Sequence, residues 1–123
     1  MAHEPLPGVA LLRSFGFAIA GVTAMLRSQA NARWHLLATA IVVAAGWHWQ
    51  VSAVQWALLA LAMGLVWGLE AMNTALEVLC DKVQPQRDPA IKAVKDIAAA
   101  GVLLGALAAA AAGLAVFLPY WLG

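Results

Sequence analysis

The sequence predicts an all-α membrane protein with a single domain over residues 1–123, for two reasons. First, 64% of its 123 residues are hydrophobic and 11% are charged, whereas soluble domains carry about 25% charged residues. Second, residues 34–69 and residues 97–123 contain no Asp, Glu, Lys or Arg. A transmembrane helix needs about 20 apolar residues. The first segment is therefore long enough for two spans and the second for one, which gives three transmembrane helices.

An additional helix is expected before these spans, at about residues 9–29. Its uncharged part, residues 14–26, is too short to cross a bilayer and lies between Arg13 and Arg27. Such a segment is typical of an amphipathic helix in the membrane interface, with its arginines among the lipid headgroups. The alternative is a signal peptide cleaved near residues 30–32. We favour the surface helix, because the apolar part is rich in Gly and Ala and the first span follows immediately.

The three transmembrane helices are expected at about residues 31–49, 54–83 and 90–118. The first two should be joined by a turn at residues 47–52, where polar residues lie among tryptophans typical of an interfacial aromatic belt. The second helix would be about 45 Å long, which exceeds the hydrocarbon thickness of about 30 Å. Its last turns should therefore leave the hydrocarbon. Residues 84–89 contain two prolines and should form the second connection.

The third transmembrane helix carries recognisable signals. Asp88 and Pro89 predict an N-cap followed by proline at the first helical position. Gly101 and Gly105 are spaced as GxxxG, which lets helix backbones approach closely. Pro119 is expected to end the helix at the opposite interface.

The distribution of basic residues predicts the orientation. Three precede the first span, four lie in residues 82–95, and neither the first connection nor the C-terminus has any. The positive-inside rule then places the N-terminus and the second connection in the cytoplasm. The same residues are too few and too scattered to bind nucleic acid. Cys80 is the only cysteine, which excludes an intrachain disulfide and a cysteine metal cluster.

A polar stripe interrupts the second transmembrane helix near its cytoplasmic end. Helical spacing places five residues within a sector of roughly 100°: Glu70, Asn73, Thr74, Glu77 and Asp81. Ionisable residues in apolar surroundings are costly unless they face a protein interior or an aqueous cavity, so the stripe indicates a functional site. Carboxylates near lysines at a membrane surface can bind a divalent cation and a polyphosphate together.

Depth in the membrane suggests different roles for two of these carboxylates. Glu70 lies about 10 Å of helix deeper than Glu77. It is therefore positioned for the polar head of a lipid, as a general base would be, while Glu77 is nearer to a water-borne reagent. The sequence contains no Walker A motif or GxGxxG loop, so a nucleotide would have to be bound by a different structural motif. The alternative is that these groups only pair with one another and hold helices together.

Three motifs resemble those of one family, the small bacterial diacylglycerol kinases and undecaprenol kinases. Residues 70–81, EAMNTALEVLCD, match its E-x-x-N-[ST]-A-[IL]-E-x-x-x-D signature. Residues 95–99, KDIAA, match the K-D-[IM]-[AG]-[AS] segment that opens its third helix. Residues 31–36, N-x-R-x-H-L, look like the start of the first span in the undecaprenol-kinase branch. The resemblance extends over about residues 13–118.

The resemblance implies a homotrimeric, ATP-dependent lipid kinase of the bacterial inner membrane, with active sites between protomers. The acceptor would be diacylglycerol, giving phosphatidic acid, or undecaprenol, giving undecaprenyl phosphate. Carried over by position, Glu70 is the catalytic base, and Glu77 and Gln29 are the Mg²⁺ ligands. The other implied roles are nucleotide binding by Phe17, Gln29, Glu77, Gln86, Arg87, Asp88, Lys95 and Asp96, polar site residues Asn73 and Asp81, and lipid binding by Glu70 and Ala99.

The sequence departs from the family pattern in two places. Gln29 and Gln86 stand where the family usually has Glu, and Arg87-Asp88 stands where it usually has Tyr-His. A glutamine carbonyl can ligate Mg²⁺ but brings no charge, so metal affinity should fall unless Asp88 or Asp81 compensates. Two alternatives to an active lipid kinase follow. One is a catalytically weakened paralogue that binds lipid or nucleotide, and the other is a small ion- or proton-coupled transporter.

Overall fold

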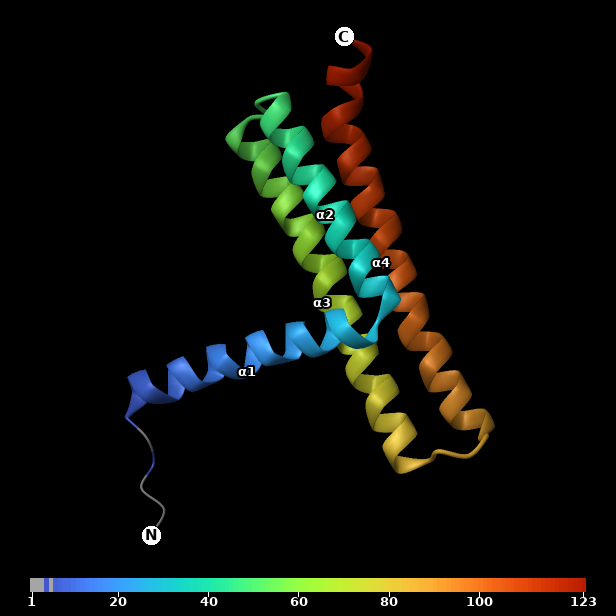
Figure 1. The fold of residues 1–123 in the computed structure, drawn as a ribbon. Helices are drawn as coiled ribbons and strands as arrows, with labels where there is room; N and C mark the ends of the chain where they lie inside the picture. Colours follow the sequence, from blue (N-terminus) through green and yellow to red (C-terminus); the bar gives the residue numbers. More distant parts are fainter. Residues whose placement is uncertain (1–3, 5) are drawn as a thin grey trace.

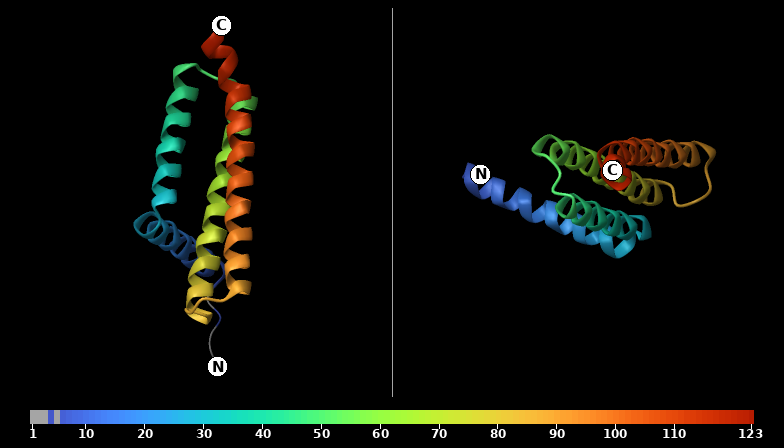
Figure 2. Two further views of the ribbon diagram at one scale, coloured as in Figure 1. Left: turned by 90° about the vertical axis from the view of Figure 1, so that its right-hand side faces the viewer. Right: turned by 90° about the horizontal axis from the view of Figure 1, so that it is seen from above.

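A computed structural model describes residue 4 and residues 6–123, and its regular structure is entirely α-helical. The helices are α1 (Pro7–Ser28), α2 (Ala30–His48), α3 (Ala53–Val83) and α4 (Pro89–Leu122). In Figure 1, α3 and α4 lie side by side and α2 runs along the same direction, whereas α1 runs across the other three. Figure 2 shows the same arrangement from two further sides. The C-terminus and the α2–α3 connection lie at one end of the bundle, and the α3–α4 connection lies at the other.

The corner between α1 and α2 consists of a single residue, Gln29. Its backbone is extended, with φ −116° and ψ 117°, which ends α1 and starts α2. The side chain of Arg33 then reaches back across the corner. Its Nη1 donates to the carbonyls of Leu26 and Arg27 at 3.2 and 3.3 Å. An arginine near the start of α2 therefore satisfies two carbonyls that the end of α1 leaves without helical partners.

The other two connections are fixed by helix caps. Ser52 and Gln55 form a capping box at the start of α3, in which each side chain bonds the backbone N–H of the other. Asp88 Oδ1 accepts hydrogen bonds from the backbone N–H groups of Ala90 and Ile91 at 2.8 and 3.2 Å. The predicted N-cap at Asp88 is therefore confirmed, with Pro89 in the first turn of α4.

The predicted end of the last helix at Pro119 is wrong, because α4 continues to Leu122. Proline removes only its own backbone donor, and its carbonyl still accepts from the N–H of Gly123 at 3.0 Å. Tertiary contacts hold this last turn. Tyr120 Oη donates to Gln55 Oε1 at 2.7 Å, and the Tyr120 ring stacks on Trp49. These contacts stabilise the helix beyond the proline.

Two glycines allow helices to approach closely within the chain. At Gly105 an added Cβ would collide with Cδ1 of Leu69, so this glycine brings α4 against α3. At Gly46 an added Cβ would lie 2.6 Å from the ring of Trp56, so this glycine brings α2 against α3. Gly101, the other glycine of the GxxxG pair, has no such neighbour within 4 Å. Within one chain, only Gly105 of the GxxxG pair allows close packing between helices.

Three described helices are long and apolar enough to cross a membrane: α1, α3 and α4. The chain is therefore a membrane protein. α2, with 19 residues, is not among the three, because polar residues at both of its ends lower its hydropathy. Length and hydropathy alone therefore assign a membrane span to α1 and not to α2. This is the reverse of the topology that the sequence analysis predicts. Direction in the fold distinguishes the two helices, since α2 runs with α3 and α4 and α1 runs across them (Figure 1).

Candidate functional site

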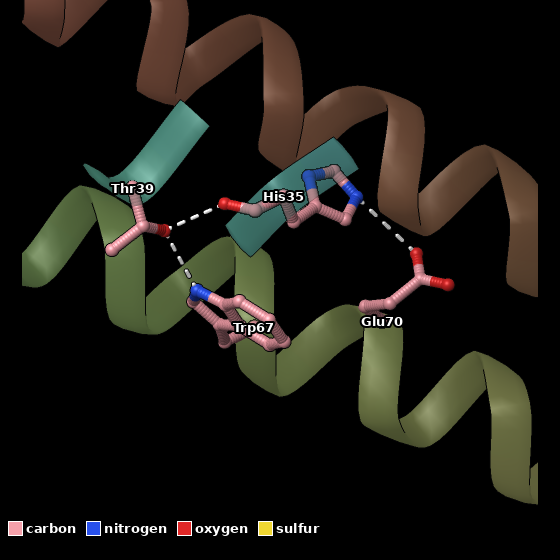
Figure 3. A network of polar contacts seen from close by, with 4 residues as sticks. All are labelled: His35, Thr39, Trp67 and Glu70. Atoms are coloured by element: carbon pink, nitrogen blue, oxygen red, sulfur yellow. Dashed lines mark hydrogen bonds and ion pairs between the residues drawn. The ribbon is translucent and has the colours of Figure 1, made fainter. Parts of the chain in front are cut away.

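Glu70 is the most deeply buried charged residue of the polar stripe. Its side chain is 1% exposed and points from α3 towards α2, where His35 Nε2 lies 3.4 Å from Glu70 Oε2 (Figure 3). That separation is an ion-pair contact but too long and poorly aligned for a hydrogen bond. Within the part of the chain that the structure describes, neither oxygen of Glu70 has a hydrogen-bond partner. A buried carboxylate with so little compensation is destabilising, which is typical of a functional group.

A hydrogen-bond bridge joins α2 to α3 one helical turn from Glu70. Trp67 Nε1 donates to Thr39 Oγ1 at 2.9 Å, and Thr39 Oγ1 donates to the carbonyl of His35 at 2.8 Å. The indole of Trp67 also meets the imidazole of His35 edge-on, with ring centroids 6.3 Å apart. Figure 3 shows His35 between this bridge and the Glu70 side chain. The bridge therefore fixes α2 against α3 at the level of the buried carboxylate.

Sequence reasoning did not find this group of His35, Thr39 and Trp67 as part of the site. A signal for its role does exist in the sequence. His35 and Thr39 are polar residues four positions apart in an otherwise apolar helix, so they share one face, and Trp67 lies one turn before Glu70.

The next turn of α3 towards the α3–α4 connection carries further oxygen atoms. Asn73 is 8% exposed, and its Oδ1 is buried. Thr74 Oγ1 is buried as well, and neither oxygen bonds to any described residue. Glu77, four residues after Asn73, is half-buried on the same side of the helix. The stripe thus presents a row of oxygen donors that continues from Glu70 towards the end of α3.

A cavity of about 790 Å³ lies at that end, between α3, the connecting loop and α4. It brings together five residues that the sequence predicts for the polar site and for nucleotide binding: Asp81, Gln86, Arg87, Asp88 and Lys95. Two ion pairs occur at this end, Lys95 with Asp81 at 2.5 Å and Lys92 with Asp96 at 2.6 Å. Asp81 is thus paired with Lys95, and Asp88 caps α4.

Three other predicted residues lie outside this cavity. Gln29 is half-buried at the α1–α2 corner, and Phe17 is 76% exposed on α1. Ala99 lines a shallow groove of about 310 Å³ between α2 and α4, together with His35. The two residues implied in lipid binding, Glu70 and Ala99, are therefore both adjacent to His35.

The described residues fit a magnesium ion only in part. They contain no group of three or more His, Cys, Asp or Glu side chains that could hold a metal. Mg²⁺, however, usually takes one or two protein carboxylates and completes its shell with phosphate oxygens and water. The Glu77 carboxylate and the buried, unsatisfied Asn73 Oδ1 are oxygen donors of the required kind on one side of α3.

Comparison with known proteins gives consistent matches. A family model described as prokaryotic diacylglycerol kinase matches residues 16–117. Undecaprenol kinase of Bacillus subtilis is 33% identical over 107 residues, which cover 87% of this chain and 87% of that protein. Diacylglycerol kinase of Synechocystis sp. is 40% identical over 110 residues, which cover 89% of this chain and 63% of that protein.

Proposed function

The chain belongs to the prokaryotic diacylglycerol kinase family and is a lipid kinase, and we propose that Glu70 is the base that activates its lipid acceptor. The observation that carries this proposal is the burial of Glu70. Its carboxylate is 1% exposed, and neither oxygen has a hydrogen-bond partner within the described chain. A carboxylate in that state retains the capacity to accept a proton from a substrate hydroxyl.

In the proposed reaction a lipid hydroxyl donates its proton to Glu70 as its oxygen attacks the γ-phosphorus of ATP. The new bond joins the lipid oxygen to phosphorus, and the bond from that phosphorus to the bridging oxygen of ADP breaks. ADP leaves, and the lipid phosphate remains in the membrane. The protein contributes mainly positioning and electrostatic stabilisation, as is usual in phosphoryl transfer.

The nucleotide is proposed to bind at the end of α3 and the start of α4. Lys95 exchanges Asp81 for a phosphate oxygen, which is a small change because both partners of this ion pair are at least one-third exposed. Gln86, Arg87 and Asp88 line the same cavity, and Asp96 is drawn from the next turn of α4. Phe17 belongs to this set through its position on α1, which contacts α3.

Mg²⁺ is proposed to be held by Glu77 and Gln29, next to Asn73. When bound, it would neutralise charge on the β- and γ-phosphates. Gln29 supplies only a neutral carbonyl, so Glu77 carries the charged part of the site. Phosphate oxygens of the nucleotide would supply further ligands, so that binding of metal and nucleotide would be mutually dependent.

In the membrane, α2, α3 and α4 are proposed to span and α1 to lie in the interface. The crosswise direction of α1 and the common direction of the other three helices support this topology (Figure 1). The basic residues around the α3–α4 connection support a cytoplasmic location in a bacterium for that end and for the N-terminus. The protein would thus be a multi-pass protein of the inner membrane.

The acceptor is tested by phosphoryl transfer from MgATP in mixed micelles, with diacylglycerol and undecaprenol assayed in parallel. Of the two relatives named above, one is called an undecaprenol kinase and the other a diacylglycerol kinase. We expect transfer to one of these two lipids. In the same assay, Glu70→Gln should lower kcat by about 10²- to 10⁴-fold. Glu4→Gln, the same chemical change at an exposed residue, is the control. Full turnover by Glu70→Gln would rule out this base.

A further inference from the structure

His35 is the polar side chain that the fold places against the proposed base. It comes from α2, whereas Glu70 comes from α3, so the contact between them depends on how two helices pack. The side chain of His35 is 20% exposed and that of Glu70 is 1% exposed. No second ion pair or hydrogen bond to the Glu70 carboxylate exists among the described residues. The imidazole is therefore the only described group available to orient that carboxylate.

The imidazole is itself held from two directions. The Thr39–Trp67 hydrogen bond fixes α2 against α3, and Thr39 bonds back to the carbonyl of His35. The Trp67 ring then packs edge-on against the imidazole. Because Trp67 precedes Glu70 by about one helical turn, the bridge and the His35–Glu70 contact lie in successive turns of the same helix face. This arrangement limits where the imidazole can lie relative to the carboxylate (Figure 3).

His35 also faces the regions open to a lipid. It lines the shallow groove that contains Ala99, between α2 and α4. It also lines an apolar cavity of about 550 Å³ among α2, α3 and α4, which continues past Thr39 and Trp67 towards Phe117. His35 is therefore common to the groove and the cavity, and it also contacts Glu70.

We propose that His35 is the positioning residue of the kinase site. Its Nε2–H holds Glu70 Oε2, so that Oε1 is turned to the lipid hydroxyl. This inference rests on the proposed role of Glu70 as the base. The 3.4 Å separation shortens to a hydrogen bond when the acceptor lipid arrives, as contacts in ligand-free active sites commonly do. A glutamate has three rotatable bonds, and fixing its carboxylate removes the need to order it during the reaction.

The test compares His35→Ala with His35→Gln by steady-state kinetics, with ATP and lipid varied separately. Loss of orientation should lower kcat by about 10- to 100-fold in His35→Ala, with KM for ATP unchanged. Glutamine places an amide N–H close to the position of imidazole Nε2, so His35→Gln should recover most of kcat. A residue that merely tied two helices together would affect KM and stability as well, and an amide would not selectively restore turnover.

Controls separate this inference from the proposed function. His48→Ala removes the other described histidine of α2, whose ring packs against Trp49 at the far end of the helix, and should leave kinetics unchanged. Glu70→Gln tests the base, and adding His35→Ala to it should cause no further loss because the two residues act as a unit. If Glu70→Gln is inactive but His35→Ala keeps its full kcat, the proposed role of His35 is overturned and that of Glu70 is retained. Turnover by Glu70→Gln would overturn the base itself.

Discussion

Two carboxylates of one helix stripe, Glu70 and Asp81, lie in opposite environments. Glu70 is buried beside His35, while Asp81 is exposed and paired with Lys95 at the cavity of the α3–α4 connection. Burial of the Glu70 carboxylate without a hydrogen-bond partner is unfavourable, and a bound substrate would reduce this electrostatic penalty. The exposed pair is weakly bound and easily exchanged. The residues at the two ends of the stripe are thus suited to different reagents, a lipid hydroxyl and a phosphate.

Lys95 should matter for nucleotide affinity more than for stability. Lys95→Met removes the cation proposed to meet a phosphate, so KM for ATP should rise by about tenfold while KM for the lipid stays the same. Thermal unfolding should change little, because an exposed ion pair contributes little to stability. Lys82→Met, on the last turn of α3, is the matched control. An equal rise in both KM values would contradict a phosphate-specific role.

Gln29 should limit the affinity for magnesium. Gln29→Glu adds a charged oxygen donor, so the Mg²⁺ concentration for half-maximal activity should fall by about tenfold. Titration of activity with Mg²⁺ at saturating ATP measures this change. Gln50→Glu, an exposed position in the connection at the opposite end of the bundle, is the control. If Gln29→Glu leaves the titration unchanged, Gln29 is not a ligand.

At the scale of the element, α3 contains both an apolar segment and the polar stripe of the candidate site. It is 31 residues long, and its first half is apolar while its second half carries the polar stripe. α4 packs along it through Gly105, which meets Leu69, the residue immediately before Glu70. The packing of α3 on α4 and the placement of the proposed base are therefore linked through adjacent residues.

The two glycines of the GxxxG pair should respond differently to the same substitution. Gly105→Ala forces a Cβ into Leu69 and should destabilise the fold by about 1–3 kcal/mol. Gly101→Ala meets nothing within 4 Å in the chain and should be tolerated. Thermal unfolding in detergent compares the two variants. Equal destabilisation would show that the motif does not act through Leu69 and that Gly101 faces another copy of the chain.

At the scale of the whole molecule, a single chain leaves a large apolar surface uncovered. Leu103, Leu104, Leu107 and Leu114 of α4 are each 58–68% exposed. Lipid tails and neighbouring copies are the two means of covering such a surface in a membrane. A single chain also provides few donors for a metal among its described residues. Both observations are compatible with an assembly of several chains.

We expect the active protein to be a homotrimer. Light scattering on protein in mild detergent should give a mass of three chains once bound detergent is subtracted. Because the family resemblance implies active sites between protomers, conditions that dissociate the trimer should remove kinase activity while each chain remains helical by circular dichroism. Activity from verified monomers would contradict a shared site.

Helix positions were largely predictable from the sequence, because they follow from local rules. Uncharged segments of about 20 residues or more determine where helices lie in a membrane. The Asp88-Pro89 cap requires only neighbouring backbone groups. The continuation of α4 past Pro119 was not predictable in this way. It depends on Tyr120 contacting Trp49 and Gln55, which are far away in sequence.

The sequence by itself determined the all-helical membrane fold, the acidic stripe of α3 and the kinase family, because each is a repeating or contiguous pattern along the chain. Only the tertiary structure decided which end of the stripe is buried and what contacts it. His35 meets Glu70 because α2 packs on α3 in one register, fixed by Thr39 and Trp67. Burial and register arise from contacts between helices that are distant in sequence, so neither can be predicted from helical periodicity alone.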